Sequence, residues 1–262
     1  SVGIIGAGPG GLAAADALRQ AGMQVTVYDR YDRVGGLMIY GIPSFKLEKD
    51  VVARYESRFR DGGVEFVLNC DVGRDIGFEE IRARHDAVLI ATGVYRLRDL
   101  AGPGAGLKGI VQALDYLTAS NRKGLGDAVP EFDSGELDAR GKRVIVVGGG
   151  DTAMDCVRTA VRQGATSVKC LYRRNRENMP GSQREVANAE EEGVEFVWLS
   201  APKGFVGDDW VTGVKVARMR LGAPDVTGRQ QPEEIPDAVH TEEADLVIKA
   251  LGFEPEDLPR LW

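Results

Sequence analysis

The chain has 262 residues, of which 43% are hydrophobic and 28% are charged, as is usual for a globular protein with room for two domains. Its net charge of −7 argues against a nucleic acid as the main partner. No apolar run reaches transmembrane length and no signal peptide precedes the first strand, so we expect a cytoplasmic protein without a membrane partner.

The cysteines and histidines do not predict a metal site. Cys70, Cys156 and Cys170 are far apart and form no CxxC motif, so neither a redox-active dithiol nor a zinc or iron–sulfur cage is encoded. We expect three core thiols in a reducing compartment. His85 and His240 lie in polar sequence surroundings and are expected to be surface residues without a role.

A glycine-rich turn follows the first apolar strand, at residues 2–5, and opens a helix. Gly6, Gly8 and Gly11 lie in the GxGxxG register. In this register the first glycine permits a tight turn, the second lets a pyrophosphate approach the backbone, and the third lets the helix lie close to the strand. The helix N-terminus offers free N–H groups to the phosphates. The turn therefore predicts a dinucleotide site.

The next strand, at residues 24–29, ends in Asp29, about 20 residues beyond the glycines, where an acid accepts hydrogen bonds from ribose hydroxyls. This position suits FAD or NAD and disfavours a 2′-phosphate. The alternative is a glycine-rich turn that binds no ligand, which explains the strand, helix and acid together less well.

The rest of the first half alternates apolar segments with glycine and polar stretches. In chain order we expect a glycine turn at 34–36, a helix over about 47–61, a strand over 64–68, a buried strand over 87–93, a crossover between domains over 94–110, a helix over 111–118 and an exposed loop over 120–140.

A second glycine fingerprint follows the apolar strand that begins near residue 142. Gly148, Gly150 and Ala153 lie in the GxGxxA register and open another helix. The pattern repeats the order of the first half about 140 residues later, which indicates an internal duplication of the fold. Two such sites in series suggest a flavin beside a nicotinamide.

The second fingerprint differs from the first where its matching strand, residues 167–172, ends. Arg173, Arg174 and Arg176 follow that strand, and no acid occupies the place of Asp29. Guanidinium groups bind phosphate with paired hydrogen bonds, and a 2′-phosphate on the adenosine ribose requires such groups here. The segment therefore predicts NADP(H), with a solvated basic turn as the alternative.

The remaining segments complete the second half. We expect a helix over 182–192, a strand over 194–199, a strand over 211–221 in an antiparallel insertion, and a strand over 245–252 that mirrors 87–93. The fold class that follows is α/β, with two Rossmann-like doubly wound nucleotide-binding domains, first for FAD and then for NADPH. We expect an FAD-binding domain at 1–103 and an NADPH-binding domain at 104–262, with its core at about 141–255.

Three stretches carry a family resemblance that extends over the whole chain. Residues 35–49 read GGLMIYGIPSFKLEK, residues 148–156 read GGGDTAMDC, and residues 172–180 read YRRNRENMP. With these motifs the chain resembles the small (beta) subunits of NADPH-dependent glutamate synthases. Wider relatives are the flavin domains of dihydropyrimidine dehydrogenase and of ferredoxin–NADP transhydrogenases.

The resemblance implies a glutathione-reductase-like arrangement in which hydride passes from NADPH to FAD. Electrons then leave through [4Fe–4S] clusters to a large (alpha) subunit, which makes L-glutamate from 2-oxoglutarate and glutamine. The family also has a Cys-rich N-terminal domain and a C-terminal segment that closes the FAD site. Neither is expected in this chain, so the clusters would not be ligated by it. The alternatives are a related enzyme with ferredoxin, sulfur or a pyrimidine as acceptor, and a non-catalytic NADPH sensor.

The motifs and the resemblance together give the expected cofactor contacts. For FAD these are Gly6, Ala7, Gly8, Pro9, Gly10, Gly11, Asp29, Arg30, Gly35, Gly36, Leu37, Lys46, Val72, Ala91, Thr92 and Gly93. For NADPH they are Gly148, Gly149, Gly150, Asp151, Thr152, Ala153, Arg173, Arg174, Arg176, Ala250 and Gly252. Tyr40 is expected either beside the flavin or in the core. We predict no catalytic residue, because hydride transfer between cofactors requires stacking and exclusion of water rather than a protein acid or base.

Overall fold

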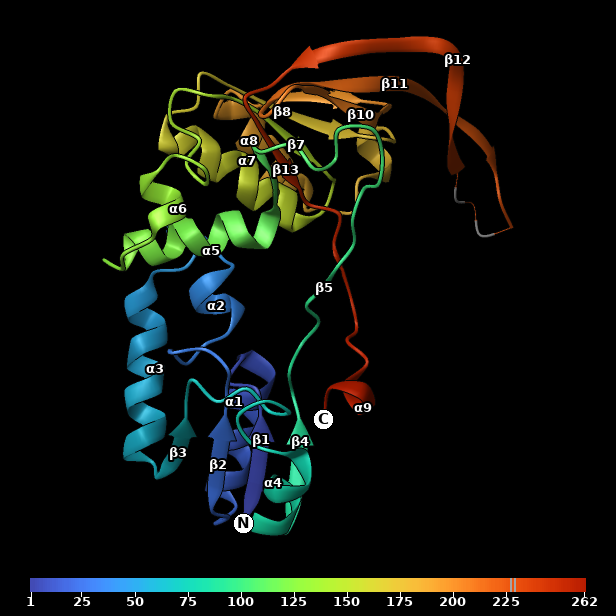
Figure 1. Ribbon diagram of the computed structural model, residues 1–262. Helices are drawn as coiled ribbons and strands as arrows, with labels where there is room; N and C mark the ends of the chain where they lie inside the picture. The colour runs from blue at the N-terminus through green and yellow to red at the C-terminus, as the bar shows by residue number, and fades with distance from the viewer. Residues whose placement is uncertain (227, 229) are drawn as a thin grey trace. The chain divides into compact units, whose positions relative to one another are not determined.

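A computed structural model describes residues 1–226, 228 and 230–262. The chain forms two compact units, unit 1 from Ser1–Arg96 with Phe253–Trp262 and unit 2 from Leu97–Gly252. The chain therefore leaves unit 1, builds all of unit 2, and returns to unit 1 with its last residues, drawn in red in Figure 1. The domain bounds expected from cofactor binding, 1–103 and 104–262, stay a prediction.

Unit 1 is built on a four-stranded parallel sheet in the order β3-β2-β1-β4. Its strands are β1 (Val2–Ile5), β2 (Val25–Tyr28), β3 (Val64–Val67) and β4 (Ala87–Ile90). Its helices are α1 (Pro9–Gln20), α2 (Leu37–Tyr40), α3 (Lys49–Asp61), α4 (Phe78–Arg84) and α9 (Leu258–Leu261).

The centre of unit 1 is where the sequence is most apolar. All four residues of β1 are buried, since β2 and β4 flank this strand in the sheet. Helix α1 begins with a proline at its first position, where the missing N–H does no harm, and buries Gly11, Leu12 and Ala15. Leu12 and Ala15 join Val25 and Val27 in one hydrophobic cluster.

The expectation of a buried strand at 87–93 is corrected by the structure. Strand β4 ends at Ile90, and Leu89 and Ile90 remain 39% and 45% exposed. The physical reason is the topology of the sheet, because β4 is its edge strand and pairs with β1 on one side. An apolar run therefore identified the strand correctly but not its degree of burial.

Unit 2 is built on a five-stranded parallel sheet in the order β6-β13-β7-β8-β9. Its strands are β6 (Ile110–Gln112), β7 (Arg143–Val147), β8 (Ser167–Tyr172), β9 (Glu195–Trp198) and β13 (Leu246–Lys249). Its helices are α5 (Ala113–Gly124), α6 (Pro130–Asp133), α7 (Asp151–Gln163) and α8 (Gln183–Glu191), with a 3₁₀ turn at Arg176–Asn178. The order β9-β8-β7-β13 repeats the order of unit 1, which confirms the α/β class and the duplication.

The central strand β7 shows why this sheet is buried on both faces. Val144 and Val146 belong to one hydrophobic cluster, whereas Ile145 and Val147 belong to another. Successive side chains of a strand point to opposite faces, so an unbroken apolar run supplies both clusters at once. On one of these faces, Val144 and Val146 share a cluster with Met154 of α7.

Helices α7 and α8 are joined by a network of ion pairs. Arg158, whose side chain is 10% exposed, donates hydrogen bonds to Glu185 at 2.8 Å and to Glu192 at 2.8 Å. Arg162 adds a bond of 2.6 Å to Glu192. These guanidinium groups, Arg162 foremost, lower the pKa of the Glu192 carboxyl to about 2, against the opposing effect of its burial.

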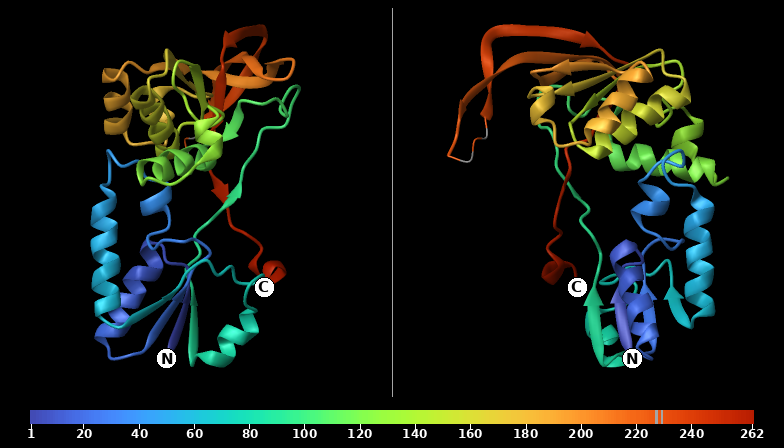
Figure 2. Two further views of the ribbon diagram at one scale, coloured as in Figure 1. Left: turned by 60° about the vertical axis from the view of Figure 1, so that its left-hand side comes forward. Right: turned by 180° about the vertical axis from the view of Figure 1, so that it is seen from behind.

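Unit 2 also carries an antiparallel sheet in the order β10-β11-β12. The strands are β10 (Ser200–Gly207), β11 (Val211–Pro224) and β12 (Gln230–Glu243), of which only β11 was expected from the sequence. Figures 1 and 2 show β11 and β12 running together away from the parallel sheet of unit 2. The expected loop at 120–140 is also corrected, because α5 continues to Gly124 and α6 follows.

Two short strands, β5 (Arg96–Leu97) and β14 (Phe253–Glu254), form a separate two-stranded sheet. Among the described residues, no helix is both long and apolar enough to cross a membrane. In the same part of the chain, no group of three or more His, Cys, Asp or Glu side chains could hold a metal ion.

Candidate functional site

The first glycine loop lies at the carboxyl end of β1. Gly6 has φ of 112°, and a Cβ there would lie 2.4 Å from the carbonyl oxygen of Ala91. A Cβ on Gly11 would lie 1.9 Å from the carbonyl oxygen of Gly6, so α1 approaches the loop too closely for any side chain. By contrast, no atom lies within 4 Å of a Cβ on Gly8 or Gly10. The loop is tight beneath and open above, as a phosphate-binding turn requires.

Asp29 follows β2 and is only 8% exposed. Its Oδ2 accepts a hydrogen bond of 2.6 Å from the Ala7 N–H, and its Oδ1 accepts one of 2.8 Å from the Tyr31 N–H. Burial raises the pKa of the Asp29 carboxyl, while these two hydrogen bonds and the charge of Arg30 oppose the rise. The carboxylate therefore fixes the glycine loop, and each oxygen retains a second lone pair for a ribose hydroxyl.

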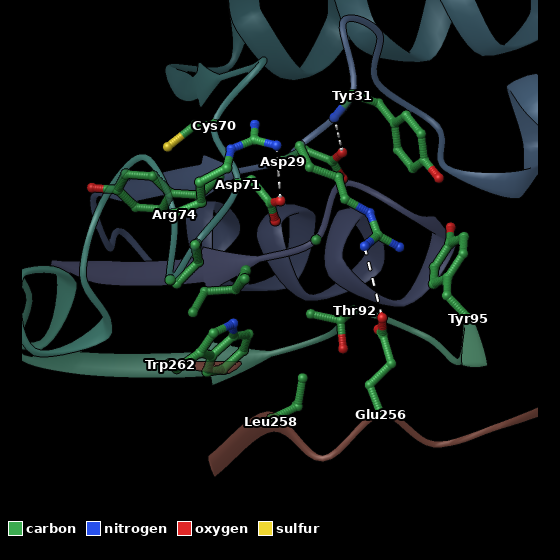
Figure 3. Close-up of a pocket in the computed structure, with 16 residues that line it drawn as sticks. Asp29, Tyr31, Cys70, Asp71, Arg74, Thr92, Tyr95, Glu256, Leu258 and Trp262 are labelled. Atoms are coloured by element: carbon green, nitrogen blue, oxygen red, sulfur yellow. Dashed lines mark hydrogen bonds and ion pairs between the residues drawn. The ribbon is translucent and has the colours of Figure 1, made fainter. Parts of the chain in front are cut away.

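A cavity of about 260 Å³ adjoins this loop in unit 1 (Figure 3). Of the expected FAD contacts, five line it: Gly6, Asp29, Arg30, Val72 and Thr92. The guanidinium of Arg30 lies 4.4 Å from the centre of the Tyr95 ring and 3.8 Å from the carboxylate of Glu256. Burial raises the pKa of Tyr95 to about 12, so the phenol stays neutral at physiological pH.

The C-terminal segment supplies a wall of this cavity that the sequence motifs did not indicate. Figure 3 shows Glu256, Leu258 and Trp262 on the segment that runs below the cavity. The Trp262 ring stacks on Phe78 with ring centres 5.1 Å apart and planes at 23°. Cys70 also lines the cavity and is partly exposed, so it is not the core thiol expected; Cys156 and Cys170 are buried as expected.

The other expected FAD contacts lie outside the residues that line this cavity. They are Ala7, Gly8, Pro9, Gly10, Gly11, Gly35, Gly36, Leu37, Lys46, Ala91 and Gly93. Several of them pack against the glycine loop instead: the Gly35 N–H donates to the Ala7 carbonyl at 2.9 Å, and a Cβ on Gly36 would lie 2.9 Å from the Gly8 Cα. Their part in cofactor binding stays a prediction.

Two further expectations in unit 1 can be compared with the structure. Tyr40 is 1% exposed and its hydroxyl donates to the Asp32 carboxylate, which places it in the core of the unit. His85 is partly buried rather than on the surface, because its ring covers Gly3 and its Nε2 lies 2.9 Å from the Tyr28 hydroxyl. Burial lowers the pKa of His85.

The second glycine loop repeats this construction at the end of β7. Gly148 has φ of 149°, and a Cβ there would lie 2.2 Å from the Ala250 carbonyl oxygen. A Cβ on Gly149 would lie 2.4 Å from the Tyr172 ring, whereas nothing lies within 4 Å of a Cβ on Gly150. The loop thus has the same tight base and the same open side as the first.

A cavity of about 590 Å³ adjoins the second loop. Of the expected NADPH contacts, eight line it: Gly148, Gly149, Gly150, Thr152, Arg173, Arg174, Ala250 and Gly252. The Nε of Arg174 is buried and has no hydrogen-bond partner among the described atoms. Burying an unsatisfied donor costs about 1–3 kcal/mol, and an oxygen acceptor, such as that of a phosphate, would offset this cost.

Three expected NADPH contacts do not line this cavity. Arg176 donates to Glu190 at 2.8 Å. Asp151 accepts a bond of 2.9 Å from the Ser182 N–H, and Ala153 is fully buried in the core. His240 is exposed, as expected. The contacts of Arg176, Asp151 and Ala153 with a nucleotide stay predictions.

Two parallel sheets, each with an open glycine loop at its carboxyl end and a cavity beside that loop, define a chain built to bind two nucleotides. Comparison with known families agrees with this description. Residues 1–260 match the family "pyridine nucleotide-disulphide oxidoreductase", and the chain belongs to that family.

Curated relatives are similar over the whole chain. It is 74% identical over 262 residues to a putative glutamate synthase [NADPH] small chain of Cereibacter sphaeroides, covering all of this chain and 63% of the relative. It is 65% identical over 262 residues to the glutamate synthase [NADPH] small chain of Azospirillum brasilense, covering all of this chain and 54% of the relative. The chain thus spans between about half and two thirds of these relatives, which confirm the resemblance drawn from the motifs.

A solved structure shows the same fold. The structure titled "Mycobacterium tuberculosis FprA in complex with NADPH" aligns with 98% of this chain and 72% of its own chain, with a TM-score of 0.83. The identity is 20%, so this likeness concerns the fold alone.

Proposed function

We propose that this chain is the FAD- and NADPH-binding core of the electron-input subunit of a glutamate synthase. The observation that carries the proposal is the contrast between the ends of two equivalent strands. Strand β2 is followed by a buried acid, Asp29, whereas β8 is followed by Arg173 and Arg174. An acid suits a free ribose, and a pair of arginines suits a 2′-phosphate, so unit 1 is assigned to FAD and unit 2 to NADPH.

The residues of unit 1 fit an FAD. The open side of Gly8 and Gly10 leaves room for a pyrophosphate, and Asp29 offers acceptors to a ribose. In unit 2 the open side of Gly150 and the buried Nε of Arg174 fit the phosphates of NADPH. When bound, NADPH would supply a hydride donor, and FAD would supply an acceptor able to pass electrons on singly.

The protein's part in this transfer is binding and orientation. The two glycine loops hold pyrophosphates at fixed places on rigid sheets, and Asp29 and Arg174 fix the ribose ends. No proton is exchanged with the protein in a hydride transfer between cofactors, so no side chain is assigned as acid or base.

The further path of the electrons is part of the same proposal. In this proposal they leave through [4Fe–4S] clusters to a large (alpha) subunit that makes L-glutamate from 2-oxoglutarate and glutamine. The names of the relatives, glutamate synthase [NADPH] small chain, support glutamate synthesis and a larger partner chain. The three cysteines of this chain are far apart in the sequence, so we assign the clusters to parts of the protein outside it. Three free cysteines suit a reducing compartment, which supports a cytoplasmic location.

The test is an anaerobic titration of the full-length protein, followed by its visible spectrum. Near-stoichiometric NADPH should bleach the flavin, and NADH should do so poorly. A preparation without flavin, or flavin that NADPH cannot reduce, would contradict the proposal for the two units and favour a non-catalytic NADPH sensor.

The acceptor needs a second measurement. With the large subunit present, NADPH oxidation should require both glutamine and 2-oxoglutarate. Reduction of the flavin without that requirement would keep the NADPH-to-FAD reaction but favour the alternative acceptors, ferredoxin, sulfur or a pyrimidine.

A further inference from the structure

One wall of the unit 2 cavity belongs to none of the nucleotide motifs. It is formed by Arg98, Asp99 and Leu100, which precede β6 in the segment expected only to cross between domains. Arg98 is exposed, so no packing in a core explains its presence on this wall. The wall brings a third guanidinium to a cavity that already has Arg173 and Arg174.

The backbone of this wall is fixed to the parallel sheet. The Arg98 N–H donates to the carbonyl of Gly252 at 3.1 Å. The next residue, Asp99, pairs with Lys249 at 2.5 Å, and the Lys249 side chain is only 8% exposed. The bond from Lys249 lowers the pKa of the Asp99 carboxyl, so Asp99 is a carboxylate at neutral pH. Arg98 is therefore held at the carboxyl end of β13.

The order of strands decides which half of a dinucleotide Arg98 can meet. Strand β7, which carries the glycine loop, lies between β13 and β8. Arg173 and Arg174 follow β8 on one side of the loop, while Arg98 is fixed to β13 on the other side. A dinucleotide bound across the ends of these strands has its adenosine half toward β8 and its nicotinamide half toward β13.

The charges of the cavity favour an anion at this place. Four ionised side chains line it among the described residues, the three arginines and Asp99, and Asp99 is already paired with Lys249. This cationic surface lies in a chain whose net charge is −7, so it is a local feature rather than a reflection of composition.

We propose that Arg98 is a binding residue for the nicotinamide-side phosphate of the dinucleotide in unit 2. The inference rests on the proposed function, because it takes NADPH as the ligand of that unit. Arg98 contacts a group that NADPH and NADH share, whereas Arg173 and Arg174 contact the 2′-phosphate that only NADPH has. It therefore adds affinity without selecting between the coenzymes.

Three ligands separate these roles by calorimetric titration of the full-length protein: NADP⁺, NAD⁺ and 2′,5′-ADP. The last contains the adenosine half with its 2′-phosphate but lacks the nicotinamide-side phosphate. Arg98→Gln should weaken the binding of NADP⁺ and of NAD⁺ by a similar factor, about 5- to 30-fold for one charge-assisted contact. The affinity for 2′,5′-ADP should stay within about twofold of the unsubstituted protein. Arg174→Gln should give the opposite pattern, weakening NADP⁺ and 2′,5′-ADP but not NAD⁺.

Arg140→Gln is the matched control, because its side chain is 78% exposed, lies outside the cavity and carries the same charge. It should leave all three ligands unchanged. Arg98→Lys keeps the charge without the planar fork and should give an intermediate loss, which serves as the second variant if Arg98→Gln is poorly folded.

Three results would overturn the inference in different ways. Unchanged NADP⁺ binding in Arg98→Gln would mean that Arg98 makes no contact. An equal loss of affinity for 2′,5′-ADP would mean that Arg98 acts through the overall positive charge of the cavity or through protein stability rather than through a direct contact. Failure of the unsubstituted protein to bind NADP⁺ or 2′,5′-ADP would instead refute the proposed function of unit 2, and the inference with it.

Discussion

The two units place the same glycine loop on the same strand order and then differ at one strand end. In unit 1 the residue after β2, Asp29, is buried and bonded to its own loop. In unit 2 the residues after β8, Arg173 and Arg174, face a cavity, and one donor of Arg174 lacks a partner among the described atoms. In the proposed assignment, the shared loop and strand order set the place of a pyrophosphate in each unit, and a few residues after the second strand set which ribose is accepted.

The third position of the fingerprint gives the largest expected effect, which is the complete loss of flavin from unit 1. Gly11 in unit 1 has no room for a Cβ, whereas Ala153 in unit 2 already carries one. Gly11→Val should push α1 off its loop, destabilise unit 1 by at least about 1–3 kcal/mol and abolish flavin binding. The measurements are the flavin-to-protein ratio and thermal unfolding.

The equivalent change in unit 2 is the control. Ala153→Gly removes a Cβ from a helix and should cost about 1 kcal/mol of stability, with NADP⁺ binding retained. Wild-type flavin content in Gly11→Val would show that the loop of unit 1 is less tight than its geometry indicates.

Arg173 and Arg174 of unit 2 give the second expected effect, which is on coenzyme binding. The double substitution of Arg173 and Arg174 by Gln should weaken NADPH binding by roughly 2–4 kcal/mol for two charge-assisted contacts, and NADH binding much less. Titration of flavin reduction by each coenzyme measures both constants. Equal losses for NADPH and NADH would refute the assignment of these side chains to the 2′-phosphate.

The next expected effect is smaller and concerns how the free energy of unfolding depends on pH through one ion-paired carboxylate in each unit. Glu192, whose pKa is lowered to about 2, contributes stability that is fully present above its unfolded pKa and is lost as pH falls toward 2. Glu192→Gln should therefore reduce the free energy of unfolding by about 1–3 kcal/mol at pH 7, because it leaves Arg158 and Arg162 without this carboxylate. The gap between variant and wild type should close as the pH is lowered from 5 to 2.

Asp75 in unit 1 is the comparison for this measurement. Its pKa is also lowered to about 2, chiefly by a hydrogen bond from Arg74, but the pair is exposed to solvent. Asp75→Asn should change chemical denaturation much less than Glu192→Gln, because water screens the pair. Equal losses would mean that exposure does not distinguish the two ion pairs.

Arg176 gives the smallest expected effect. It pairs with Glu190 at 2.8 Å and does not line the cavity, so its predicted contact with the nucleotide should be weak, and Arg176→Gln should reduce NADPH affinity by less than about 1 kcal/mol. The same titration as for Arg173 and Arg174 measures it. A loss as large as theirs would show that the 3₁₀ turn rearranges when the nucleotide binds.

Much of the fold could be predicted because its signals are local. Apolar runs bounded by glycines gave the parallel strands of both sheets except β6, which lies where a crossover and the start of a helix were expected, and apolar spacing gave α3 and α8. Strand β12 was missed since it is mostly exposed and carries Pro232 and Pro236, which are typical of edge strands and break the usual alternation. The later part of α5 was missed because its exposed residues are polar, and tertiary contacts rather than apolar spacing stabilise it.

The residues of the two sites also divide into those that local sequence patterns predict and those that only the fold brings to a cavity. The glycine loops, Asp29 and the arginines after β8 are short-range patterns and could be read directly. Arg98 and Trp262 could not, because no motif surrounds them and they reach their cavities only through the long-range topology of the chain. Residues of this kind can be identified only when the three-dimensional fold is known.

The return of residues 253–262 to unit 1 has a consequence for synthesis. Glu256, Leu258 and Trp262 leave the ribosome only after residues 97–252, which takes on the order of 10 s or more at ordinary rates of translation. During that time the nascent first unit has its glycine loop but lacks one wall of its cavity. Cofactor capture in this unit should therefore follow the folding of unit 2, and FAD added during translation should not be retained before residues 253–262 have emerged.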